Sequence, residues 1–352
     1  MVRAIVSACV LASCAYNGSF SDCAISCTTA GCPDGLTCGG EGLCRLPGQT
    51  TTCAAIFRPP PSCIGLPATC GPTASDDCCS IAQPIPGGTF YRSYDVAPDG
   101  MYADTSHPAT VSAFRLDKYE VTVGRFRKFV ETGMGTQANP PAAGGGAHAK
   151  IPSSGWDASW NGALVADAAA LSAALQCDAL YQTWTTTPGP NEDLPINCVS
   201  WYEAMVFCAW DGGYLPTEAE WNYAAAGGDE QRAYPWSSPA GSTTIDCADA
   251  NYHPTSICTG TVNRVGSESP RGDGKYGHSD LGGNVWEWLL DWSGQLPIPC
   301  VDCANLTTAT YRSIWGGGWF EPAAALRVGS GNSGTPTGRS NGIGLRCARA
   351  QG

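Results

Sequence analysis

Apolar residues recur at helical spacing directly after Thr122. A hydroxyl at this position can cap the first turn of a helix, and the apolar residues that follow would lie on one face of it. These residues are Val123, Phe126, Phe129 and Val130. The preceding segment, Phe114 to Val121, alternates apolar with polar positions, which predicts a half-buried strand. Gly87 to Phe90 is a further short strand candidate, because it follows a turn.

Two further helices are predicted by paired capping residues. Ser200 stands three residues before Glu203, and Thr217 stands three residues before Glu220, so each pair can satisfy two backbone donors at a helix start. Double glycines at 212–213 and 227–228 would end these helices. From Tyr234 onward the chain is aromatic, rich in glycine and turns, and without a helical period of useful length.

The composition predicts a protein that is rich in loops and acidic. The chain has 352 residues, of which 43% are apolar, so it can fill a sizeable core. Charged residues make up only 14%, against about 25% in ordinary soluble domains, and 44 glycines with 26 prolines predict long irregular connections. The formal net charge of −12 argues against nucleic acid or anionic lipid surfaces as partners.

Twenty cysteines indicate an oxidising compartment. Near the N-terminus, Leu11-Ala12-Ser13-Cys14 follows a short apolar stretch and fits a bacterial lipoprotein cleavage box. We therefore expect 1–13 to be a signal peptide, Cys14 to be lipidated, and the protein to be anchored in the periplasm or on the outer-membrane surface. The alternative is an ordinary secretory signal with a chance cysteine, which predicts a secreted protein.

The cysteine spacing predicts the domain organisation. Residues 14–45 hold closely spaced cysteines with almost no apolar pattern, so we expect a stub held by disulfides. A zinc site is the competing interpretation, but the segment lacks Cys-x2-Cys pairs and histidine. Residues 46–83 are rich in proline and cysteine and are expected to form a linker. The main domain is expected at 84–350.

Seven short motifs occur in one order along the main domain. They are Gly-Gly-Thr-Phe at 87–90, Asp-Lys-Tyr-Glu-Val-Thr at 117–122, Leu-Pro-Ile-Asn-Cys-Val-Ser-Trp at 194–201, Leu-Pro-Thr-Glu-Ala-Glu-Trp at 215–221, Tyr-Pro-Trp at 234–236, Gly-Asn-Val-Trp-Glu-Trp at 283–288 and Gly-Leu-Arg-Cys at 344–347. In this order they resemble the family of formylglycine-generating enzymes, also called sulfatase-modifying factors. The resemblance implies an α+β domain of the formylglycine-generating-enzyme-like type, related to C-type lectin folds, with little regular secondary structure.

The resemblance also implies that the protein binds calcium ions. Its main site would use the carboxylates of Asp280 and Glu287 with the carbonyls of Gly283 and Val285, and such oxygen ligands suit a hard cation. The alternative is that Glu287 only hydrogen-bonds loop amides in a tryptophan-lined corner. A second, weaker calcium site is matched in part by Asn251 and the carbonyl of Tyr252. Its later acidic ligand has no counterpart in 259–264.

The residues that bind copper in that family have no counterpart in this sequence. Its members oxidise a substrate cysteine with copper held by two thiolates, and the matching positions here are Glu321 and Leu326, while Gly318 replaces a serine. Copper(I) needs soft thiolate ligands, so we expect neither copper nor formylglycine formation. The resemblance further implies a disulfide between Cys208 and Cys347. Proximity along the chain suggests three more, which are Cys177–Cys198, Cys247–Cys258 and Cys300–Cys303.

Two functional hypotheses follow from this pattern. The first is a monomeric, non-catalytic module that binds a peptide, protein or glycan in a groove. The expected groove residues are Trp315, Gly318, Trp319, Phe320, Glu321 and Arg327. The second is an oxidoreductase or protein-maturation enzyme of the same family with a changed metal site, in which Glu321 would be the candidate acid or base.

Overall fold

The chain divides into two compact units, and the larger one spans Pro60–Gln351. The computed structural model describes residues 37–38, 44–48, 60–80, 84–253 and 258–351. In the smaller unit the described residues form one antiparallel pair, β1 (Thr37–Cys38) with β2 (Cys44–Arg45). Lipidation at Cys14, the signal peptide and most of the predicted stub lie outside the described residues.

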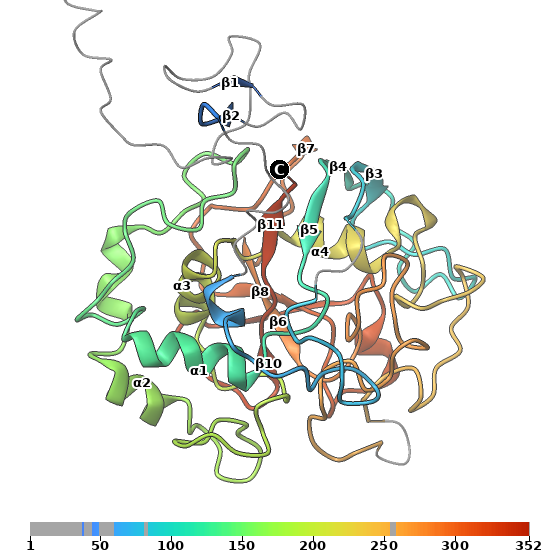
Figure 1. Ribbon diagram of the computed structural model, residues 1–352. Coiled ribbons are helices and arrows are strands. Elements are labelled where there is room, and N and C mark those ends of the chain that lie inside the picture. The colour runs from blue at the N-terminus through green and yellow to red at the C-terminus, as the bar shows by residue number, and fades with distance from the viewer. Residues whose placement is uncertain (1–36, 39–43, 49–59, 81–83, 254–257, 352) are drawn as a thin grey trace, which may run out of the picture. The chain divides into compact units, whose positions relative to one another are not determined.

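Short helices and strands joined by long loops make up the larger unit (Figure 1). Its α-helices are α1 (Val123–Thr132), α2 (Ala168–Ala174), α3 (Trp201–Trp210) and α4 (Glu218–Ala225). Its 3-10 helices are η2 (Pro61–Cys63), η3 (Ala158–Ala163), η4 (Gly228–Glu230) and η5 (Ala323–Leu326). Its strands are β3 (Gly88–Tyr91), β4 (Pro108–Val111), β5 (Phe114–Leu116), β6 (Trp286–Trp292), β7 (Cys300–Val301), β8 (Arg312–Trp315), β9 (Gly331–Gly334), β10 (Ile343–Gly344) and β11 (Ala348–Ala350). This mixture confirms the predicted α+β class.

The central sheet of the larger unit has the strand order β10-β6-β8-β9. Strand β6 runs parallel to β10 and antiparallel to β8, and all seven of its residues are buried. Two smaller sheets have the orders β3-β4-β7 and β11-β5. Both α3 and α4 pack against β6, so this strand is the structural centre around which the later motifs are arranged.

The predicted helix starts are confirmed in atomic detail. The Thr122 side chain accepts a hydrogen bond from the Arg125 amide at the start of α1. Complete capping boxes begin α3, where Ser200 pairs with Glu203, and α4, where Thr217 pairs with Glu220. Each box satisfies backbone donors that a helix end would otherwise leave without a partner.

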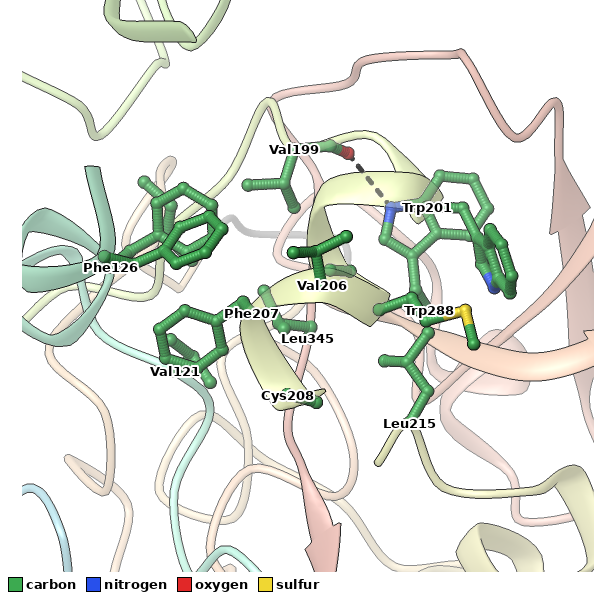
Figure 2. Packing of buried hydrophobic residues seen from close by; sticks show 14 of the residues in the cluster. Val121, Phe126, Val199, Trp201, Val206, Phe207, Cys208, Leu215, Trp288 and Leu345 are labelled. Atoms are coloured by element: carbon green, nitrogen blue, oxygen red, sulfur yellow. Dashed lines mark hydrogen bonds between the residues drawn. The ribbon is translucent and has the colours of Figure 1, made fainter. Parts of the chain in front are cut away.

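A large apolar cluster joins α1, α3 and β6. Figure 2 shows Phe126 of α1 beside Phe207 of α3, and the two rings are stacked with centroids 5.3 Å apart. The indole Nε1 of Trp288 donates to the carbonyl oxygen of Val199 at 3.0 Å, so this buried tryptophan is also satisfied as a hydrogen-bond donor (Figure 2).

Two sequence expectations about elements need correction. Only Phe114–Leu116 forms a strand, which pairs with β11. Beyond it the chain stays beside the C-terminal segment through separate hydrogen bonds, in which the amides of Asp117 and Val121 donate to the carbonyls of Cys347 and Leu345. Strand β6 was not predicted. Its residues are buried on both faces, so they show no alternation that would distinguish them from a buried helix.

The expected linker of 46–83 also needs correction, because Pro60 is the first residue of the larger unit. Ser62 is fully buried, its amide donates to Asp211, and its hydroxyl accepts from Arg125 of α1. Two disulfides, Cys63–Cys79 and Cys70–Cys78, hold this segment in shape. Residues 60–80 therefore pack as part of the main domain and do not act as a spacer.

Candidate functional site

A tight glycine turn connects β8 to Glu321 and Leu326, the two positions that the sequence resemblance matches to a thiolate pair. Gly316 and Gly317 have φ values of 105° and 76°, a region that other residues rarely adopt. A Cβ atom on Gly317 would lie 2.7 Å from Leu326 Cδ1. The turn therefore brings the segment of Trp319 and Glu321 back beside β6, where the Trp319 amide donates to the carbonyl of Asn284.

Neither position of the matched pair offers a thiolate substitute. One oxygen of the Glu321 carboxylate accepts from the indole Nε1 of Trp286 at 3.2 Å. Leu326 is only 1% exposed and belongs to an apolar cluster with Tyr234 and Tyr252. A leucine side chain has no lone pair with which to coordinate a metal ion. Glu321 and Leu326 therefore have different and unrelated local roles.

Every cysteine in the described part of the larger unit is in a disulfide. The predicted pairs Cys177–Cys198, Cys208–Cys347, Cys247–Cys258 and Cys300–Cys303 are all confirmed. With the two bridges of the 60–80 segment, these account for all twelve cysteines from residue 60 onward in the described ranges. No free thiol is left among them.

Beside Glu321 lies a cluster of three rings, the aromatic surface, formed by Tyr181, Trp319 and Phe320, and Leu180 precedes Tyr181 in the chain. The ring of Trp319 packs against Tyr181 with centroids 5.0 Å apart and against Phe320 at 5.4 Å. Leu180 is 82% exposed, Phe320 39% and Tyr181 37%. The buried Nε1 of Trp319 has no hydrogen-bond partner within the described residues, so one donor at this surface is unsatisfied.

The predicted groove is split by the structure. Trp319, Phe320 and Glu321 are consecutive at the aromatic surface, and Gly318 accepts from the Glu321 amide. Trp315 instead packs in β8 against Trp221. Arg327 does not face Glu321, because its guanidinium forms buried hydrogen bonds to Asp95 and an ion pair with Asp99 at 2.8 Å. Sequence proximity suggested one groove, but the chain turns between these residues.

The Glu287 carboxylate is already occupied by protein donors. Both of its oxygens accept from Arg346 Nε at 2.8 Å, and one also accepts from Trp221 Nε1 at 2.7 Å. Both partners of this ion pair are fully buried. The residues present therefore do not fit Glu287 as a calcium ligand, because a guanidinium would repel the ion at close range. This geometry corresponds to the alternative interpretation, a carboxylate in a tryptophan-lined corner.

Asp280 lies in a different environment. Its carboxylate accepts from the Gly266 amide at 2.6 Å and forms no ion pair within the described residues. Burial and the neighbouring Glu268 raise the pKa of Asp280 to about 8. Glu268 accepts a hydrogen bond from the Asn263 side chain, and one oxygen of each of these two residues is buried without a hydrogen-bond partner. Asp280 is thus linked through Glu268 to two oxygens without donors.

The other expected calcium residues lie in packed loops, where hydrogen bonds involve the amides of Gly283 and Val285 and the side chain of Asn251. Gly283 donates to the carbonyl of Gly316, and a Cβ atom on it would lie 2.5 Å from the Asn251 carbonyl oxygen. The Val285 amide donates to Glu120. The Asn251 side chain accepts from Thr259 and donates to Thr261, and Tyr252 is buried. Within the described residues, no three His, Cys, Asp or Glu side chains are grouped to hold a metal.

A pocket of about 550 Å³ was missed by the sequence reasoning. Its walls include Arg92, Glu218 and Trp315. No motif indicates Arg92, and Glu218 was considered only as part of a helix cap. The available signals were Trp315, which was expected in a different groove, and the chemical type of Glu218, a carboxylate at the first position of a buried helix.

None of the described helices is long and apolar enough to cross a membrane.

The sequence and the fold were compared with known proteins. Residues 79–351 match the family described as the Sulfatase-modifying factor enzyme 1-like domain. The "Formylglycine-generating enzyme" of Thermomonospora curvata is 31% identical over 290 residues, covering 75% of this chain and 91% of that protein. The "Inactive C-alpha-formylglycine-generating enzyme 2" of Bos taurus is 29% identical over 302 residues, covering 76% and 87%. The structure of PvdO from Pseudomonas aeruginosa is similar in fold, with a TM-score of 0.53 at 20% identity, covering 78% of this chain and 98% of that chain.

Proposed function

Because the chain belongs to the sulfatase-modifying factor family, we propose that it is a member without formylglycine-generating activity that binds a peptide or glycan. The observation that carries this proposal is the state of the two matched positions. Glu321 is hydrogen-bonded to Trp286, and Leu326 is buried in the core. A relative of similar length that is named inactive supports the idea that the scaffold can exist without this activity.

The donor set does not fit copper(I). This ion is held by soft thiolates, which a carboxylate replaces poorly and a leucine not at all. The cysteines of the described part of the larger unit are all oxidised, so none of them can substitute from another position. The loss of both thiolates therefore supports a protein that binds without oxidising.

The aromatic surface supports binding. Aromatic side chains bury large areas at little cost in side-chain entropy, and they are enriched where proteins bind peptides and sugars. The rings of Tyr181 and Phe320 both pack against Trp319 and are more than a third exposed, so they offer a ligand an aromatic contact area.

The deciding experiment uses a cysteine-containing sulfatase peptide as the probe. After incubation with copper and oxygen, mass spectrometry should find the cysteine unchanged, while titration calorimetry should detect binding. Replacing Phe320→Ala should weaken this binding about tenfold, whereas Tyr311→Ala, at an exposed tyrosine outside the aromatic surface, should not. Conversion of the peptide to its aldehyde would contradict the proposal. If the peptide is neither bound nor oxidised, a panel of glycans tests the second ligand class, and no binding there also contradicts it.

The alternative is an oxidoreductase of the same family with a changed metal site. It is favoured by the 31% identical relative that is named a formylglycine-generating enzyme. This alternative predicts copper or iron at about one equivalent per chain after dialysis, together with oxidation of the peptide. Metal without oxidation, or neither of them, argues against it.

We further propose that calcium binds at Asp280, without Glu287 as a ligand. Buried acceptor oxygens of Asn263 and Glu268 support a hard cation there. Calcium should raise the melting temperature of the parent protein relative to chelator and should have no effect on Asp280→Asn. Identical melting of the parent in calcium and chelator rules the ion out.

We also propose lipid anchoring at Cys14 in an extracytoplasmic compartment. The six disulfides of the larger unit support an oxidising environment. Mass spectrometry of the mature N-terminus should find an acylated Cys14, and Cys14→Ser should release the protein from membranes. An unmodified start elsewhere in the chain is the contrary result.

A further inference from the structure

The Cys300–Cys303 disulfide closes the shortest loop among the bridges in the described part of the larger unit. Its cysteines are 3 positions apart, whereas the other bridges span 8 to 139 positions. A disulfide restricts the unfolded chain less when its loop is shorter, so this bridge contributes least to stability by that effect. It can therefore open at the smallest cost to the fold.

The loop around the two sulfurs is held by contacts that do not need the bridge. Cys300 lies in β7 opposite Ala109 of β4. The Asp302 amide donates to the Thr110 carbonyl at 2.9 Å, and the Asp302 carboxylate accepts from the amide and the hydroxyl of Ser112 at 2.6 and 2.7 Å. These contacts keep the two thiols adjacent after reduction, which allows the bridge to form again.

A buried arginine lies beside one of the two sulfurs. Arg92 is 1% exposed, its Nη1 lies 3.8 Å from Cys303 Sγ, and its Nη2 donates to the carbonyl of Pro297. Glu218 and Asp291 favour its protonated form, but neither forms an ion pair with it within the described residues. A neighbouring guanidinium favours the thiolate form of a cysteine, so Arg92 stabilises Cys303 once the bridge is reduced.

The carboxyl groups around the bridge and Arg92 oppose a thiolate only in part. Asp302 forms an ion pair with Lys150 at 3.4 Å. Burial and the neighbouring Asp291 raise the pKa of Glu218 to about 8, so this group is mostly protonated near pH 7. The Asp291 carboxylate accepts hydrogen bonds from the amides of Glu218 and Asn305. Each of these carboxyl groups is thus paired, hydrogen-bonded or neutral.

One cysteine of the bridge is more accessible than the other. Cys303 is partly exposed, whereas Cys300 is only 4% exposed. An incoming thiolate therefore reaches Cys303, and Cys300 is the protected sulfur that closes the bridge again. Ile298 and Val301, beside the bridge in the chain, are 60% and 68% exposed. They offer apolar contact area to a polypeptide that carries the thiolate.

We propose that Cys300–Cys303 is a redox-active disulfide that oxidises the dithiol of a partner polypeptide to a disulfide. The Cys-x-x-Cys spacing and a cationic neighbour are both typical of reactive cysteines. Cys303 is the sulfur that is attacked, and Arg92 is the residue that stabilises it after reduction. This activity does not depend on the proposed ligand of the aromatic surface.

The exchange takes place in two steps. A thiolate of the partner attacks Cys303 Sγ, the bond to Cys300 Sγ breaks, and its electron pair leaves on Cys300, which takes up a proton. The second partner thiolate then attacks the partner's sulfur in this mixed disulfide, and the electron pair of the broken bond stays on Cys303 as a thiolate. The partner loses two electrons and two protons, and the second proton goes to solvent.

Graded dithiothreitol redox buffers test how easily the bridge opens in the full chain, with alkylation of free thiols and mass spectrometry as the readout. Cys300–Cys303 should be half reduced at a ratio of reduced to oxidised dithiothreitol at least about tenfold lower than Cys247–Cys258 requires. Arg92→Gln should raise this ratio about tenfold, because the thiolate loses its neighbouring charge. Arg271→Gln, at an exposed arginine in an ion pair with Asp246, is the matched control and should leave it unchanged.

Two serine variants identify the attacked sulfur and leave Arg92 in place, because Arg92 also holds the Pro297 carbonyl and its replacement can disturb the fold. In Cys300→Ser, the remaining Cys303 should form a mixed disulfide with glutathione disulfide at pH 6, since its thiolate is stabilised. Cys303→Ser leaves the buried Cys300, which should react at least about tenfold more slowly. Matching circular dichroism spectra show that both variants are folded.

The activity itself is measured with a reduced synthetic peptide that contains two cysteines, in the presence of chelator. The parent protein should convert about one equivalent of peptide to its disulfide form per chain, beyond what the double variant Cys300→Ser, Cys303→Ser converts. A bridge that needs as much reductant as Cys247–Cys258, an unchanged ratio in folded Arg92→Gln, faster reaction of Cys300 than of Cys303, or equal oxidation by the double variant would each overturn the proposal.

Discussion

Glu287 is a fully buried carboxylate whose charged partner is Arg346. The carboxylate of Glu287 has Arg346 on one side and the Trp221 indole on the other, and it is completely buried. The same guanidinium donates to the carbonyls of Ser279 and Asp280, so it ties together the segment before β6 and the C-terminal strand region. The positive charge that Glu287 contacts beside Trp221 is therefore the Arg346 guanidinium.

Glu287→Gln should therefore be strongly destabilising. Removing one charge of a buried ion pair leaves the other without compensation, which typically costs about 3–5 kcal/mol. Asp246→Asn changes an exposed partner of Arg271 and should lower the stability far less, because solvent screens this ion pair. Urea unfolding of both variants measures the difference. Similar stabilities for the two would mean that the buried pair is dispensable.

The buried Asp280 carboxyl gives a prediction about pH in the presence of chelator. Its pKa is about 8 in the folded protein against 3.8 when unfolded. The stabilising contribution is thus complete below about pH 4 and is lost as the pH rises through about 8, because the folded state retains a proton that the unfolded chain has released. The free energy of unfolding should fall between about pH 4 and 8.

Asp280→Asn should flatten this decline. The decline should not vanish, because Glu218 and Asp291 have pKa values raised in the same direction. Denaturant unfolding of parent and variant across the pH range is the measurement. A parent whose stability rises with pH over this window, or a variant with an undiminished slope, would refute the assignment.

At the scale of elements, short helices are held in place by their ends. Arg125 of α1 donates to Ser62, to Asp117 and to Asp211, so one side chain connects η2, the segment after β5 and the end of α3. Burial opposes ionisation of Asp117, but Arg125 and Arg349 outweigh it and hold its pKa below the usual value. The capping box of α4 has a similar role, since it fixes the helix start from which Glu218 reaches the pocket.

Thr217→Ala should therefore lower the free energy of unfolding by about 1 kcal/mol, the usual cost of losing a helix cap. The hydroxyl accepts from the Glu220 amide at 3.0 Å, and Thr217→Ser keeps that acceptor. The serine variant should accordingly retain most of the stability in the same thermal or urea titration. Equal losses in both variants would point to packing of the methyl group and away from the cap.

At the scale of the whole molecule, contacts between distant segments hold a loop-rich chain together. The Cys208–Cys347 disulfide joins α3 to the C-terminal region across 139 positions of sequence. The 60–80 segment adds a second long-range constraint through Ser62 and the Tyr119 hydroxyl, which donates to Asp76 at 2.7 Å. Burial and this hydrogen bond raise the pKa of Tyr119.

A protein that begins at Pro84 should consequently be less stable than one that begins at Pro60. The shorter form leaves the Arg125 Nε and the Tyr119 hydroxyl without partners, and each loss costs about 1–3 kcal/mol. Thermal unfolding of the two forms, produced with their disulfides oxidised, compares them directly. Indistinguishable melting temperatures would show that 60–80 contributes nothing, as a true linker would.

Several features could be read from local sequence because they depend on neighbours along the chain. Capping boxes at Ser200 and Thr217 involve residues three apart, and disulfides such as Cys300–Cys303 join cysteines that are close in sequence. The loss of the thiolate pair at Glu321 and Leu326 was equally visible, since it is a matter of residue type. These are the parts of the fold and of the candidate site that the sequence by itself determined.

Only the tertiary structure decided which charge faces which. Glu287 finds Arg346, Arg327 turns to Asp95, and Arg92 lines a pocket with Glu218, although all these pairs are far apart in sequence. Electrostatic energy depends on distance and burial, neither of which a pattern of residue types contains. The residue types at the matched positions can thus be read from the sequence, whereas the environment that produces an ion pair, an isolated carboxyl or a pocket arises only when the chain is folded.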